Sequence, residues 1–242
     1  MERERGAGRL FVAVDVDSLT GAEALLDRLQ GVVTGCKIGS QLFTAAGPAA
    51  VEAAHKRGYR VFLDLKFHDI PNTVAGAVRE ATRLGVFMLN VHAGGGRVMM
   101  RAAAEAAVKA AGDFAVARPL CLGVTVLTSL DRRALQTELR VAASVGAHVL
   151  HLADLSREAG LDGCVASPEE IGLLRMALGP RWVIVTPGIR PSALGDDQKR
   201  TATPSAAVAA GADYIVVGRP IIAAPDPVEA ARRILQELTG AA

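Results

Sequence analysis

Short runs of β-branched and aliphatic residues alternate with stretches rich in alanine, leucine, glutamate and arginine along the whole chain, and this alternation constrains the fold most. A strand followed by a helix that leads back to the same sheet is the repeating unit of a parallel sheet. Eight strands are predicted, at Leu10–Val16, Thr34–Gly39, Arg60–Phe67, Met88–Ala93, Leu120–Leu127, Gly163–Ala166, Trp182–Thr186 and Tyr214–Val217. The helices predicted after them are Gly21–Gln30, Pro48–Arg57, Asn72–Leu84, Arg97–Ala110, Leu139–Ala159, Ser167–Leu178, Pro204–Ala210 and Pro227–Leu238.

Eight strand–helix units without a break in composition predict an α/β fold, a single (β/α)8 TIM barrel. The predicted domain covers residues 1–242, with residues 1–9 as a possible flexible N-terminal tail. A doubly wound open sheet is the structural alternative, but no GxGxxG turn follows the first strand. Gly94-Gly95-Gly96 also lacks the spacing and the Lys-Ser/Thr pair of a phosphate-binding P-loop.

The bulk composition bounds the kinds of partner. The 27 basic and 25 acidic residues give a net charge of +2 without a long basic run, so we expect no nucleic-acid partner. No apolar run approaches the length needed to cross a bilayer, and the charged N-terminus does not resemble a signal peptide, so we expect a cytoplasmic protein without membrane contact. Cys36, Cys121 and Cys164 form no CxxC pair and predict neither a disulfide framework nor a zinc site.

Charged residues gather where the first four predicted strands end. In a barrel enzyme the active site lies at the carboxyl ends of the strands, so charge at these positions is informative. The residues in question are Asp15, Lys37, Asp64, Lys66, Asp69 and His92. Any one of them is more simply explained as an ion pair that closes the barrel. Several on three successive strands favour a functional site, because buried charges persist only when paired.

Strand periodicity refines this prediction. Asp64 and Lys66 are two residues apart and therefore point to one face, while Leu65 and Phe67 point to the other. The apolar pair should face the outer helices, which directs the charged pair into the barrel mouth. There Lys37, Asp64, Lys66 and Asp69 are expected to form an alternating array of charges. For His92, a hydrogen bond to a neighbouring loop and a catalytic role remain equally good interpretations.

A second signal follows the last two predicted strands. Many barrels bind phosphate in these two loops, through backbone N–H groups and a cationic side chain. Gly218-Arg219 is the best candidate by position, and Arg190 and Gln198 are expected to complete the site. The alternative for both arginines is a pair of solvated surface charges. Their placement on these two loops favours a phosphorylated small molecule that reaches from this end to the charged array.

The segment Asp64-Leu65-Lys66-Phe67-His68-Asp69-Ile70-Pro71-Asn72-Thr73 resembles the signature of the orotidine 5′-phosphate decarboxylase family, a D-x-K-x-x-D motif followed by I-P-N-T. FVAVD, CKIG, VTVLTS, TPGIRP, GDDQKR and VVGRPI are similar to further family segments over nearly the whole chain. Magnesium-dependent sugar-phosphate lyases share D-x-K-x-x-D and are the closest alternative. The HDIPNT continuation, GIRP and the glutamine-containing loop favour the nucleotide decarboxylase. A catalytically silent nucleotide-binding or scaffold barrel is a more distant alternative.

The resemblance implies an enzyme that converts orotidine 5′-phosphate to uridine 5′-phosphate and CO2, the last step of UMP biosynthesis, with no cofactor and no metal. It implies that Lys66 delivers the proton to C6 of the pyrimidine and that Asp64 lies against the substrate carboxylate. It further implies that Asp15 and Lys37 bind ribose hydroxyl groups.

The resemblance also implies a homodimer with shared active sites. Asp69 and Thr73 would reach into the site of the other subunit, and Thr128 would lie beside the pyrimidine. The residues assigned to the phosphate by the resemblance are the four at the end of the chain already described: Arg190, Gln198, Gly218 and Arg219.

Overall fold

The structure, a computed structural model, describes residues 6–190 and 201–240. Eight parallel strands close into a barrel in chain order, with β8 paired to β1. The strands are β1 (Leu10–Ala13), β2 (Gly35–Gly39), β3 (Arg60–Phe67), β4 (Met88–His92), β5 (Leu120–Val124), β6 (Gly163–Val165), β7 (Val183–Thr186) and β8 (Tyr214–Val217). This confirms the predicted (β/α)8 barrel.

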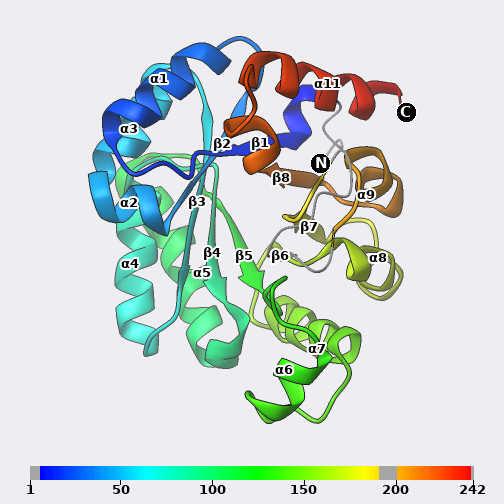
Figure 1. The fold of residues 1–242 in the computed structure, drawn as a ribbon. Helices are drawn as coiled ribbons and strands as arrows, with labels where there is room; N and C mark the ends of the chain where they lie inside the picture. Colours follow the sequence, from blue (N-terminus) through cyan, green and yellow to red (C-terminus); the bar gives the residue numbers. More distant parts are fainter. Residues whose placement is uncertain (1–5, 191–200, 241–242) are drawn as a thin grey trace.

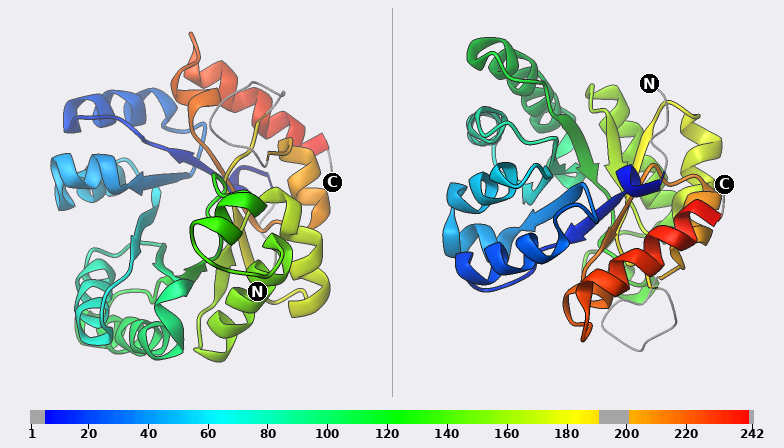
Figure 2. Two further views of the ribbon diagram at one scale, coloured as in Figure 1. Left: turned by 60° about the horizontal axis from the view of Figure 1, so that its bottom comes forward. Right: turned by 90° about the horizontal axis from the view of Figure 1, so that it is seen from above.

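The helices surround the strands on the outside (Figures 1 and 2). The α-helices are α1 (Leu19–Leu29), α2 (Ser40–Ala46), α3 (Pro48–Lys56), α4 (Pro71–Arg83), α5 (Gly96–Phe114), α6 (Arg132–Thr137), α7 (Val145–Glu158), α8 (Ile171–Leu178), α9 (Pro204–Ala210), α10 (Arg219–Ile222) and α11 (Pro227–Gly240). Three 3-10 helices are η1 (Gly6–Arg9), η2 (Ala93–Gly95) and η3 (Pro168–Glu170). The predicted N-terminal tail thus includes the short helix η1.

The alternation of side chains along each strand divides the core into two layers. On β3, Val61 and Leu63 belong to the apolar layer between strands and helices, while Phe62 belongs to the smaller cluster inside the barrel. Phe11, Met88 and the other buried strand residues of that inner cluster fill the barrel below its mouth. The inside of the barrel is therefore a packed core, and the polar side chains that point inward lie at the carboxyl ends of the strands.

The helical region predicted at Leu139–Ala159 is wrong at its start. Residues 139–144 are irregular, and α7 begins after Ser144, whose hydroxyl caps the helix by accepting a hydrogen bond from the N–H of Ala147 at 3.3 Å. The separate helix α6 precedes it, capped in the same way by Asp131. Figure 1 shows α6 beyond the tip of the β5 arrow, at the end of the barrel where the strands finish.

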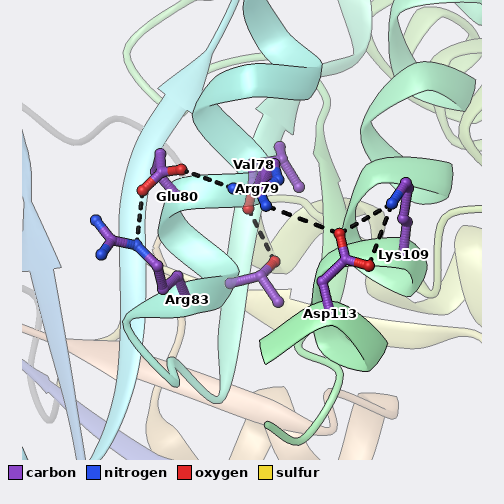
Figure 3. A network of polar contacts seen from close by, with 7 residues as sticks. Val78, Arg79, Glu80, Arg83, Lys109 and Asp113 are labelled. Carbon is purple, nitrogen blue, oxygen red and sulfur yellow. Dashed lines mark hydrogen bonds and ion pairs between the residues drawn. The ribbon is translucent and has the colours of Figure 1, made fainter. Parts of the chain in front are cut away.

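Helices α4 and α5 pack side by side, with a network of ion pairs on their outer surfaces (Figure 3). Arg79 of α4 contacts Glu80 at 3.1 Å and Asp113 of α5 at 3.7 Å, and Asp113 also accepts from Lys109 at 2.9 Å. Each such exposed pair contributes at most about 1 kcal/mol, so buried residues such as Val78 hold the helices together. This packing fixes α4, which begins directly after the charged end of β3.

Within the two described segments, no helix is both long enough and apolar enough to cross a membrane.

Candidate functional site

A cavity of about 560 Å³ opens at the carboxyl ends of the strands. Its walls bring together residues from both ends of the chain, and they include eight of the predicted site residues: Asp15, Lys37, Asp64, Lys66, Thr128, Arg190, Gly218 and Arg219. Their side chains come from segments separated by up to about two hundred residues, and the barrel closure places them around one space. Gln198 lies outside the described residues.

A cavity of about 1020 Å³ lies at the opposite end of the barrel. Two of its arginines, Arg60 and Arg118, are engaged in contacts within the protein. Arg118 pairs with Asp162 at 2.6 Å, and Arg60 donates to the carbonyl of Gly8 at 2.7 Å while its guanidinium stacks 4.5 Å above the Phe87 ring. The cavity at the carboxyl ends therefore remains the candidate active site.

Four charged side chains form an alternating chain along one wall of the 560 Å³ cavity. Lys37 Nζ lies 3.0 Å from Asp15 Oδ1 and 3.4 Å from Asp64 Oδ2, and Lys66 Nζ lies 2.7 Å from Asp64 Oδ1. The inner members are the more buried: the side chains of Lys37 and Asp64 are 10% and 13% exposed, against 37% for Lys66. Each interior charge thus has opposite charges as neighbours, which offsets part of its desolvation cost.

The predicted orientation of these residues is confirmed. Asp64 and Lys66 line the cavity, whereas Leu65 and Phe67 pack against the outer apolar layer. The local backbone is not a regular strand, however. Lys66 has a φ of 51°, a left-handed backbone conformation that residues other than glycine rarely adopt. In addition, the pairing of β3 with β4 shifts register between Leu63 and Phe67.

Asn90 is a site residue that sequence reasoning missed. Its Oδ1 accepts from the backbone N–H of Lys66 at 2.8 Å, and its Nδ2 donates to Asp64 Oδ1 at 2.7 Å. Asn90 is fully buried on β4. An asparagine between two apolar strand residues, Leu89 and Val91, is a signal that could have identified it, because buried amides need hydrogen-bond partners.

Gly39 lies against the same array at the end of β2. A Cβ atom at this position would lie 2.7 Å from Lys37 Nζ and 3.3 Å from Asp15 Oδ1. The absence of a side chain therefore makes room for the Lys37–Asp15 pair.

The phosphate candidates line the same cavity from the last two strands. Arg190 follows β7 and is only 5% exposed, and its backbone N–H donates to the carbonyl of Ala202 at 2.9 Å. Gly218 and Arg219 follow β8, where Gly218 lies close to Ala13 of β1. Two guanidinium groups and a glycine backbone at this end provide donors suited to a phosphate.

Asp69 and Thr73 do not join the array within one chain, so the expectation that Asp69 continues it is wrong for the single subunit. Both residues are exposed, neither lines the cavity, and Asp69 Oδ1 accepts from the backbone N–H of Ile70 at 2.6 Å. The chain leaves the barrel after Phe67 and enters α4 at Pro71. Ile70, between them, exposes 68% of its surface.

His92 does not line the cavity either. Its ring stacks on His68 with centroids 5.2 Å apart. Burial lowers the pKa of His92, and the neighbouring His68 and Lys66 lower it further. These contacts favour a packing role for the neutral imidazole. Among the described residues, no group of three or more histidine, cysteine, aspartate or glutamate side chains has an arrangement that could hold a metal ion.

A (β/α)8 barrel that gathers paired charges and arginine-bearing loops around a cavity at the carboxyl ends of its strands defines a barrel enzyme. The family model described as "Orotidine 5'-phosphate decarboxylase / HUMPS family" matches residues 8–234. The chain therefore belongs to this family.

Similar proteins cover nearly the same length. The orotidine 5'-phosphate decarboxylase of Moorella thermoacetica is 54% identical over 98% of this chain and 95% of its own length. That of Syntrophotalea carbinolica is 54% identical over 96% of each. The crystal structure of orotidine 5'-phosphate decarboxylase from Lactobacillus acidophilus superposes with a TM-score of 0.85 at 35% identity, covering 97% of this chain and 99% of that chain.

Proposed function

We propose that this protein is an orotidine 5′-phosphate decarboxylase, which releases CO2 from C6 of the pyrimidine and forms uridine 5′-phosphate. The observation that carries the proposal is the chain of charges from Asp15 through Lys37 and Asp64 to Lys66, on the wall of a cavity that Arg219 also lines. The names of the full-length relatives support the same activity.

The chemistry accounts for the array. Breaking the C6–carboxylate bond leaves an electron pair in the plane of the pyrimidine, where the π system cannot delocalise it. A fixed cation beside C6 stabilises that charge. Lys66, the most exposed lysine of the array, supplies the ammonium and transfers one proton from Nζ to C6, and it recovers a proton from solvent after product release.

Asp64 has two proposed roles. It holds the Lys66 ammonium at 2.7 Å, and it places a negative charge near the substrate carboxylate. Repulsion between the two carboxylates is relieved when CO2 leaves. Binding at the distant phosphate, by Arg190, Gln198, Gly218 and Arg219, supplies the free energy that brings them together.

The same proposal assigns ribose hydroxyl groups to Asp15 and Lys37 and the pyrimidine to Thr128, all of which line the cavity. No metal or organic cofactor takes part in it. Three buried free cysteines support a reducing compartment, and we propose the cytoplasm.

The activity is tested by adding orotidine 5′-phosphate to the purified protein and following its ultraviolet absorbance. We expect turnover that is unchanged by EDTA. The Lys66→Ala variant should bind uridine 5′-phosphate with similar affinity yet show no turnover. Loss of activity with chelator would favour a magnesium-dependent reaction, and near-normal activity of Lys66→Ala would contradict the proposed mechanism.

We further propose a homodimer in which Asp69 and Thr73 complete the site of the partner subunit. Their exposure, next to the exposed apolar Ile70, supports this arrangement. Mixing the inactive variants Lys66→Ala and Asp69→Ala should restore activity, because every heterodimer then contains one intact site. Absence of recovery in heterodimers isolated with two affinity tags would exclude shared sites.

A further inference from the structure

Asn90 occupies the inside of the barrel directly behind the charged array. It lies in the middle of β4, two residues after Met88, which belongs to the inner apolar cluster, and it is 0% exposed. It does not line the 560 Å³ cavity, and it pairs in register with the apolar Leu122 of β5. A fully buried amide among apolar neighbours is costly unless both of its ends are hydrogen-bonded.

Both ends are bonded, and to two different parts of β3. The backbone N–H of Lys66 is only a donor, so the amide oxygen of Asn90 must face it, at 2.8 Å. This orientation leaves the Nδ2 group for the Asp64 carboxylate, at 2.7 Å. The side chain is therefore held in one orientation by two unlike partners.

The acceptor end replaces a missing strand contact. From Leu63 to Phe67, β3 advances four residues while its partners on β4, Leu89 and Val91, are two residues apart. The extra residues form a bulge in which Lys66 adopts a φ of 51°. An uncommon backbone conformation of this kind persists only where its surroundings fix it. In this bulge the Lys66 N–H is bonded by Asn90.

We propose that Asn90 is a positioning residue that templates the Lys66–Asp64 pair, fixing the backbone of the lysine with its oxygen and the carboxylate of the aspartate with its nitrogen. This inference rests on the proposed decarboxylase activity. Asn90 touches no substrate in this proposal. It sets the direction in which Lys66 Nζ enters the cavity, and it keeps one oxygen of Asp64 engaged so that the other faces Lys37.

Two substitutions test the two hydrogen bonds of the Asn90 side chain. Asn90→Leu has a similar volume and removes both hydrogen bonds. Asn90→Asp retains an acceptor for the Lys66 N–H but places a second carboxylate against Asp64. Thr82→Ala is the matched control, since Thr82 is also fully buried and hydrogen-bonded, to the carbonyl of Val78 at 2.8 Å, on α4 away from the cavity.

For Asn90→Leu we expect kcat to fall about 10- to 100-fold, the equivalent of one hydrogen bond to a charged group, with KM changed less than about threefold. Thr82→Ala should lose stability without this loss of kcat. If Asn90→Leu does not fold, the pH dependence of kcat in Asn90→Asp tests the proposal alone.

The Asn90→Asp variant should gain a pH dependence. Position 90 faces Asp64 and Lys66 of β3, with Lys37 of β2 beyond Asp64 and His92 two residues along β4. When one of the two adjacent carboxyl groups takes up a proton, it can donate to the other. The ratio of variant to wild-type kcat should therefore rise at least about fivefold between pH 8.5 and pH 6.

The proposal is overturned if folded Asn90→Leu keeps kcat within twofold of wild type, or if the Asn90→Asp ratio does not change with pH. A wild-type protein without decarboxylase activity would instead refute the proposed function. In that case crystal structures decide the role of Asn90: a Lys66–Asp64 distance that stays near 2.7 Å in Asn90→Leu would overturn it, and a separated pair would support it.

Discussion

Gly39 offers a test in which activity and stability should separate. An alanine Cβ at this position would lie 2.7 Å from Lys37 Nζ, closer than carbon and nitrogen atoms approach, and 3.3 Å from Asp15 Oδ1. The φ of Gly39 is −94°, so the backbone accepts alanine without strain. The atom that must move is the end of a flexible lysine side chain. We therefore expect the Gly39→Ala variant to fold normally with a displaced ammonium group.

The displacement sets the size of the effect. Reaching an ordinary contact of 3.4 Å requires Lys37 Nζ to move about 0.7 Å, which lengthens its 3.0 Å contact with Asp15 to about 3.7 Å if the movement is directed away from that residue. With an effective dielectric constant of about 20, the attraction falls from about 5.5 to about 4.5 kcal/mol. Solvent at the half-exposed Asp15 reduces this loss, and weakening of the charged hydrogen bond adds to it. We expect a loss of about 1–2 kcal/mol in transition-state stabilisation, or about 5- to 30-fold in kcat/KM.

The assay compares kcat/KM for orotidine 5′-phosphate with the free energy of unfolding in urea. Gly39→Ala should change the latter by less than about 1 kcal/mol. Gly172→Ala is the matched control, because Gly172 is an exposed residue of α8 with open space around its Cβ position. It should leave kinetics unchanged and stabilise the protein by about 0.5–1 kcal/mol. A folded Gly39→Ala variant with wild-type kcat/KM would refute the reasoning that the position of Lys37 Nζ matters.

Three further outcomes are expected. Arg219→Ala should raise KM for orotidine 5′-phosphate about 10- to 100-fold through loss of a charge-assisted phosphate contact; an equal loss with phosphate-free orotidine would contradict that role. The three cysteines, whose thiol pKa values burial raises to about 12, should react with a thiol reagent at pH 8 only after denaturant is added; rapid labelling of native protein would argue against their burial. Burial lowers the pKa of His55, His92 and His148 below 6.5, so the unfolded state binds more protons and stability should fall as pH drops from 7.5 to 5.5. A urea midpoint that is constant over this range, or higher at pH 5.5, would contradict the last expectation.

The sequence predicts the barrel and much of the array because both depend on local patterns. Strand–helix alternation identifies the eight strands, and a period of two places Asp64 and Lys66 on the inner face. Helices such as α10, with only four residues, escape prediction because so short a segment has no full apolar period. The sequence predicts helix through the irregular segment before α7 because the composition of that segment does not interrupt the helical pattern.

The position of Asp69 within one chain and the role of Asn90 depend on contacts between strands. Sequence spacing suggests that Asp69 continues the array, but the bulge in β3 and the turn toward Pro71 carry it outside. The bulge is defined by pairing with β4, and periodicity along one strand does not contain that information. The role of Asn90 likewise arises from contacts 24 and 26 residues away along the chain.

The charge balance of the array explains why both ends of the cavity are needed. Two carboxylates and two ammonium groups alternate, so the four charges compensate one another in the absence of ligand. A substrate carboxylate brought beside Asp64 adds a negative charge to that balance. When CO2 leaves, this charge passes to C6, where the proton from Lys66 neutralises it, and the array is restored when Lys66 recovers a proton from solvent. A carboxylated pyrimidine nucleoside without phosphate gains little from entering such a site, because no other attraction offsets the repulsion between its carboxylate and Asp64. Attraction of the phosphate to Arg190 and Arg219, at a distance from the reacting carbon, offsets the unfavourable free energy of placing the substrate carboxylate beside Asp64. Phosphate binding is therefore part of catalysis as well as of recognition.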